Sequence, residues 1–145
     1  MIAWLLWACH KAPVPAPAEP VSEAHFVGAA ACSGCHPDSD AAWQDSAHAH
    51  ALTPLREAGR SNDPSCLLCH TTGFARPSGF GSGGDNALLA SVGCESCHGP
   101  GSLHQAQPAL HPLRASLSAE SCQSCHTVDN SPDFELASYW SRIVH

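Results

Sequence analysis

The stretch VGCESCHGPGSLH, from Val92 to His104, holds two cysteines three residues apart and a histidine directly after the second one. Residues three and four apart lie on one face of a helical turn, so Cys94, Cys97 and His98 can point the same way. That geometry matches the edge of a porphyrin, with both thiols on its vinyl groups and the imidazole at its iron. C-x-x-C-H is the attachment sequence of c-type haem. The stretch therefore predicts one covalent haem.

The same five-residue pattern occurs four times, as CSGCH at 32–36, CLLCH at 66–70, CESCH at 94–98 and CQSCH at 122–126. Zinc sites and disulfides also use paired cysteines, but neither requires a histidine after every second cysteine. With 11 histidines in 145 residues, four such histidines by chance have a probability of about 3 in 100,000. We expect four haems bonded to Cys32, Cys35, Cys66, Cys69, Cys94, Cys97, Cys122 and Cys125, with proximal iron ligands His36, His70, His98 and His126.

The rest of the chain predicts a mainly α fold with extensive loops, little or no β structure and a core filled by haem. Helices are expected over residues 37–52 and 131–144, where a proline stands near each start and Ser131 can cap the second. Ser118 can cap a short helix at the fourth motif. Residues 73–86 are rich in glycine and predict a loop. Long runs of Gly, Ser, Pro and Ala leave little apolar material for a polypeptide core.

The charge balance excludes one class of partner. The formal net charge is -7, with six Lys and Arg, and a nucleic-acid-binding protein would present a basic stripe. An acidic surface suits solubility or attraction to basic protein partners. We expect no nucleic-acid partner.

The composition of the first 24 residues predicts that the protein is exported from the cytoplasm. Residues 1–9 resemble a signal segment, and LWAC resembles a lipoprotein cleavage box in which Cys9 is lipidated. A cleaved export signal, or an apolar terminus with an idle cysteine, are the alternatives. Residues 10–24 are rich in Pro and Ala and predict an extended linker. The haem domain is expected over residues 25–145, in the periplasm or another extracytoplasmic space, anchored through Cys9.

The chain has 11 histidines, more than the four that the motifs provide as proximal iron ligands. Met1 is the single methionine and lies outside the expected domain, so methionine ligation is excluded by count. Each iron then has a second histidine or an open face, and both arrangements favour low reduction potentials. The remaining histidines are His10, His25, His48, His50, His104, His111 and His145.

Four stretches carry a family resemblance. These are CSGCHPDSDAAWQDSAHAHAL (32–52), CLLCHTTGF (66–74), SVGCESCHGPG (91–101) and ESCQSCH (120–126). They are similar to the tetrahaem cytochromes of the c-554 type, which accept electrons from hydroxylamine oxidoreductase. Residues 131–145 resemble the terminal helix of related multihaem proteins.

The resemblance implies a second iron ligand for three of the haems. It assigns His104 to the first haem, His145 to the third and His48 to the fourth. It leaves the haem of His70 open, unless His25, His50 or His111 fills that position. His50 lies two residues from His48, so both cannot serve one iron from the same helix.

Electron transfer between extracytoplasmic redox proteins is the function that the resemblance and the haem count favour, with no catalytic side chain. Two alternatives stay open. An open haem at His70 can reduce a small nitrogen or oxygen species, which would make the protein an enzyme. The chain can also be a haem subunit of a larger complex or filament.

Overall fold

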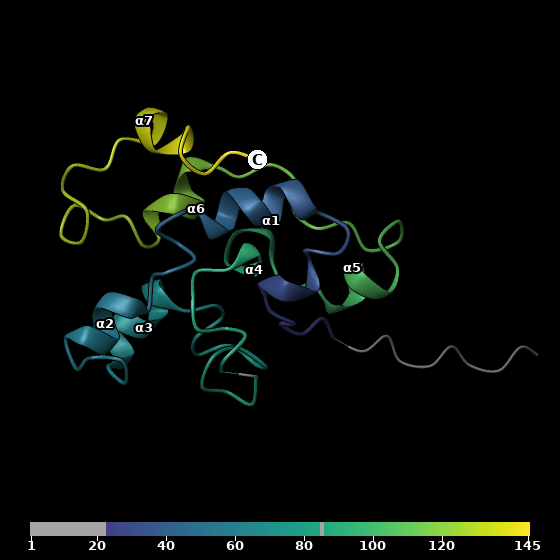
Figure 1. Ribbon diagram of the computed structural model, residues 1–145, viewed down its shortest axis with the longest axis horizontal. Coiled ribbons are helices and arrows are strands. Elements are labelled where there is room, and N and C mark those ends of the chain that lie inside the picture. Colours follow the sequence, from purple (N-terminus) through teal and green to yellow (C-terminus); the bar gives the residue numbers. More distant parts are fainter. Residues whose placement is uncertain (1–22, 85) are drawn as a thin grey trace, which may run out of the picture.

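The computed structural model describes residues 23–84 and 86–145 (Figure 1). Cys9, His10 and the signal segment 1–9 lie outside the described residues, as does the linker 10–24 apart from its last two positions. No helix in the described part of the chain is long and apolar enough to cross a membrane.

The described residues form short helices joined by turns and loops, with no strand among them. This confirms the predicted fold class. The elements are η1 (Ala29–Ala31), α1 (Pro37–Gln44), α2 (Thr53–Glu57), α3 (Pro64–His70), α4 (Cys94–His98), α5 (Ser102–Ala106), α6 (Ala119–Gln123) and α7 (Leu136–Trp140).

Helix α1 is shorter than the sequence predicts. It starts at Pro37 as expected, with Asp38 and Asp40 in its first turn, but it ends at Gln44 instead of continuing to residue 52. Residues 45–52 form turns, because their polar groups bond elsewhere. Ser46 Oγ donates to the carbonyl of Trp43, and the carbonyl of His48 accepts from the amide of Val92.

The predicted helix over residues 131–144 is also wrong in its extent. Helix α7 covers five residues, its N-cap is Glu135, and Ser131 caps nothing there. The Ser131 hydroxyl instead lies 3.0 Å from the ring Nδ1 of His126. Ser118 occupies the N-cap position of α6 as expected, but its side chain makes no capping hydrogen bond. The loop expected over residues 73–86 is confirmed, since residues 73–84 and 86 contain no helix or strand.

The polypeptide core is small. The buried apolar residues among those described are Phe26, Ala29, Leu52, Leu55, Leu67 and Leu89. Leu52, Leu55 and Leu67 form one cluster, which packs α2 against α3. Figure 1 shows these two helices at one end, α5 at the other, and α6 with α7 along one edge. Helices α3, α4 and α6, which carry or begin the second, third and fourth motifs, lie in different parts of the molecule, with α4 near its middle.

Candidate haem sites

Three pairs of histidine rings face each other at nearly the same separation. The ring centroids of His36 and His104 lie 6.4 Å apart, those of His48 and His126 lie 6.0 Å apart, and those of His98 and His145 lie 6.1 Å apart. In each pair one histidine ends a C-x-x-C-H motif and the other is distant in sequence.

These separations fit a shared metal. With metal–nitrogen bonds of about 2.0 Å and about 1.1 Å from each nitrogen to its ring centre, two imidazoles on opposite sides of one iron have centres about 6.2 Å apart. Direct ring stacking would bring the centres closer, as in His126 and Phe134 at 4.5 Å. The side chains present therefore suit an iron between each pair, next to two cysteines that can bond the porphyrin.

His70 differs from the other three motif histidines. Among the residues the structure describes, no second histidine ring lies beside it, and its Nδ1 bonds the carbonyl of Ala51. Two of the expected alternatives, His25 and His50, are exposed, and His111 is half-buried. The structure brings none of the three into ring contact with His70.

Hydrogen bonds at Nδ1 orient most of these rings. His98 Nδ1 lies 2.6 Å from the carbonyl of Arg114, and His145 Nδ1 lies 2.8 Å from the carbonyl of Ile143. His104 Nδ1 lies 3.0 Å from the carbonyl of His111. A carbonyl can only accept, so Nδ1 carries the proton and the lone pair is on Nε2. That is the tautomer a metal-binding histidine needs, with its ring held in place.

The surroundings of His48 and His126 favour the neutral form of both imidazoles, because they lower the pKa of each ring. Burial lowers the pKa of His48 below its ordinary value, and the neighbouring His126 lowers it further. Burial likewise lowers the pKa of His126. Phe134 stacks on the His126 ring, and Tyr139 meets both rings edge-on.

The motif cysteines meet across motifs. The thiols of Cys32 and Cys94 interact with each other, and this interaction raises the pKa of Cys32 and lowers that of Cys94. Burial, together with a contact to Cys125, raises the pKa of Cys69 to about 11. The first motif is therefore next to the third, and the second is next to the fourth.

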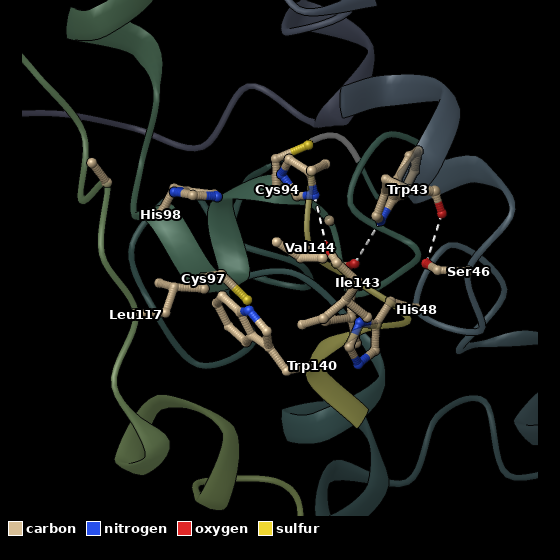
Figure 2. A pocket seen from close by; sticks show the side chains of 14 residues that line it. Trp43, Ser46, His48, Cys94, Cys97, His98, Leu117, Trp140, Ile143 and Val144 are labelled. Atoms are coloured by element: carbon tan, nitrogen blue, oxygen red, sulfur yellow. Dashed lines mark hydrogen bonds between the residues drawn. The ribbon is translucent and has the colours of Figure 1, made fainter. Parts of the chain in front are cut away.

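A cavity of about 120 Å³ lies against the third motif. Figure 2 shows Cys94, Cys97 and His98 of α4 on one wall and Trp140, Ile143 and Val144 on another. His48 and His145 also line it. The lining thus combines two thiols, ligand-type imidazoles and apolar side chains, a donor set suited to a covalently bound, largely apolar macrocycle.

Two tethers that the sequence did not reveal hold the third motif in place. The ring Nε1 of Trp43 donates to the carbonyl of Val92 at 2.9 Å. The buried hydroxyl of Thr72 donates to the carbonyl of Ser91 at 2.7 Å and accepts from the amide of Gly93 at 2.9 Å. Both tethers position the entry to α4. The Trp43 position was a recognisable signal, since it belongs to the Trp-containing stretch that resembles the family.

The chain resembles known proteins in sequence and in fold. Residues 31–99, which contain the first three motifs, match the family described as "Cytochrome c554 and c-prime". Cytochrome c-554 of Nitrosomonas europaea is 36% identical over 95 residues, an alignment that covers 55% of this chain and 40% of that protein. The chain therefore matches less than half the length of that curated relative.

The fold is shared as well. The structure of reduced cytochrome c554 from Nitrosomonas europaea superposes with a TM-score of 0.66 at 24% identity, covering 82% of this chain and 83% of that one. This superposition extends the likeness beyond the segment matched in sequence. Residues 31–99 thus resemble the cytochrome c554 family in sequence, and the chain resembles a cytochrome c554 in fold.

Proposed function

We propose that the protein is an electron-transfer protein with four covalent c-type haems, relaying single electrons between extracytoplasmic redox partners. The three histidine pairs with centroids 6.0 to 6.4 Å apart carry this proposal. When bound, each haem iron supplies one-electron redox chemistry, and the protein sets its potential through axial ligands, hydrogen bonds and burial.

The ligand assignment follows the paired rings. His36 and His104 hold the first iron, His98 and His145 the third, and His126 and His48 the fourth. His70 holds the second iron alone. Two imidazoles on an iron favour a low-spin centre at low potential, which suits a relay and leaves no position for substrate.

The thiol contacts support an order for the relay. Cys32 meets Cys94, and Cys69 meets Cys125, so the first haem adjoins the third and the second adjoins the fourth. Cys97 lies near Cys122 and Cys125: burial raises the pKa of the Cys97 thiol, and these two neighbouring thiols raise it further. Electrons would then pass along the sequence first, third, fourth and second haem.

The proposal places the haem domain, residues 25–145, outside the cytoplasm. The linker 10–24 would join it to a membrane anchor on lipidated Cys9. The formal net charge of -7 favours donor or acceptor proteins with basic surfaces.

The mass of the holoprotein and its spectra test the proposal. Four haem increments on the chain, three low-spin signals and stepwise reduction by single electrons are expected. Fewer than four increments would contradict the haem count. A diacylglyceryl increment on the N-terminal peptide tests the anchor separately, and its absence would contradict lipidation of Cys9.

A second function, reduction of a small nitrogen or oxygen species at the haem of His70, is favoured by the single observation that no described histidine ring faces His70. A high-spin ferric signal together with carbon monoxide or nitric oxide binding would support a reactive open iron. Four purely low-spin haems would exclude it.

A further inference from the structure

The most buried charged side chain of the described residues belongs to the third haem motif, at Glu95, which is 3% exposed. One carboxylate oxygen accepts from the amide of Gly101 at 2.7 Å, and the other accepts from the amide of Gly28 at 2.8 Å. The amide of Val27 is shared by both oxygens at 3.0 and 3.1 Å. The carboxylate is thus held by backbone donors from two segments distant in sequence.

Within the described part of the chain, no cationic side chain pairs with this carboxylate. The one ion pair within residues 23–84 and 86–145 joins Arg60 to Asp63. A buried carboxylate is costly unless hydrogen bonds replace its water shell, and backbone amides are the donors that do so here. Any displacement of those two segments would leave the charge unsolvated, so Glu95 constrains where both of them lie.

Both segments lead directly to ligands of the first haem. Val27 and Gly28 precede η1 and the first motif, which ends at His36. Gly101 is the N-cap of α5, which carries His104. His36 and His104 are the pair with the most nearly parallel rings, at 23°.

Two glycines allow the backbone to reach the carboxylate. Gly28 has a φ of 84°, and a Cβ there would meet Leu88 Cβ at 2.8 Å. A Cβ on Gly101 would lie 3.3 Å from an oxygen of Glu95. The close packing at Gly101 means that the carboxylate and the chain leading to His104 are in direct contact.

We propose that Glu95 is a positioning residue for the first haem, although it lies in the attachment motif of the third. It fixes the segment before Cys32 and the segment before His104 to one carboxylate, and so sets the spacing of His36 and His104. The proposal rests on the ligand assignment under Proposed function.

Glu95→Gln tests this in the holoprotein, because the amide keeps the size of the side chain but replaces one acceptor oxygen by a donor that faces an amide. The expected result is loss of one low-spin signal in electron paramagnetic resonance and a rise of one midpoint potential, with all haems still attached by mass. Gln123→Glu is the matched control: Gln123 occupies the same motif position in the fourth motif and is exposed. Unchanged low-spin signals in Glu95→Gln would overturn the proposal.

A double variant separates this inference from the ligand assignment. If Glu95 acts through His104, adding Glu95→Gln to His104→Ala changes the low-spin signals no further, while an additional loss would overturn the proposed route. If His104→Ala alone changes nothing, the ligand assignment fails, and with it the inference that depends on it. If Glu95→Gln yields no holoprotein, Gly101→Ala replaces it. A partial shift of the same signal is then expected, and an unchanged signal would refute the role of Glu95.

Discussion

The rings of His36 and His104 lie with their centroids 6.4 Å apart and their planes 23° from parallel. His36 is the N-cap residue of α1, and His104 lies in α5, beyond the third motif. A separation that suits an iron between two imidazoles has therefore been built from two distant parts of the chain. It depends on the backbone between them, which passes through α4 and then, from the C-cap Gly99 to the N-cap Gly101, leads into α5.

His104→Ala should convert one low-spin haem to high-spin and raise its midpoint potential, because the first iron loses one of its two imidazoles. Electron paramagnetic resonance and a redox titration of the holoprotein measure both effects. His25→Ala is the control, since His25 is exposed and has no ring contact in the described structure. A spectrum identical to that of the parent protein would show that His104 is not a ligand.

His48→Ala should have the same spectral effect on the fourth haem, whereas His50→Ala should have none. His48 faces His126 at 6.0 Å, but His50 is exposed. The two residues belong to the same turn region, so the pair of variants separates ligation from general disturbance of residues 45–52. Equal spectra for both variants would contradict the assignment of His48.

Thr72→Val should destabilise the holoprotein by about 1 to 3 kcal/mol, because the carbonyl of Ser91 and the amide of Gly93 would stay buried without their partner. Thr72 is only 2% exposed. Denaturant unfolding followed by far-ultraviolet circular dichroism measures the change. Thr53→Val, at an exposed position, should be close to neutral, and equal losses in the two variants would contradict a special role for Thr72.

Acid should destabilise helix α3, because it protonates the carboxylate of Asp63, the N-cap residue of that helix. Its carboxylate accepts from the amide and hydroxyl of Ser65 and from Arg60, which lowers its pKa from 3.8 to about 2. The stabilisation is therefore complete above pH 3.8 and is lost as the pH falls toward about 2. In an acid titration of the holoprotein by circular dichroism, Asp63→Asn should flatten the pH dependence in that window. An unchanged profile would exclude this contribution.

The polypeptide without attached haem should be largely unfolded. The described residues bury only a handful of apolar side chains, and small domains that depend on a bound group for their core lose their fold without it. Circular dichroism of protein expressed without haem attachment should show little helix and no cooperative thermal transition. A cooperative transition would show that the polypeptide core suffices.

The haem attachment sites could be predicted from the sequence alone, because the attachment pattern is local. Cys94, Cys97 and His98 are close in the chain, and one helical turn puts them on one face whatever surrounds it. The scarcity of strand patterns and of apolar residues likewise predicted short helices and loops. The extents of the helices over residues 37–52 and 131–144 were wrong, because the polar groups of Trp43, His48 and Ser131 bond to distant or neighbouring partners instead of continuing a helix.

The choice between His48 and His50 shows what local sequence could not decide. The two lie two residues apart in a histidine-rich stretch. In the fold, Trp43 and His48 both hydrogen-bond the backbone of Val92, and it is the ring of His48 that lies beside His126. The family resemblance named His48, but the residues themselves left both open.

The role of Glu95 is a second feature that the local sequence could not reveal. In the sequence it is a variable position of a haem motif, equivalent to the exposed Gln123. Its burial arises because Gly28 and Gly101 bring backbone amides to its carboxylate. The sequence by itself determined the Cys-x-x-Cys-His patterns that predict haem attachment, since each pattern needs only one turn of chain. Only the tertiary structure decided which second histidine ring lies beside His36, His98 and His126, since that depends on contacts between segments far apart in the chain.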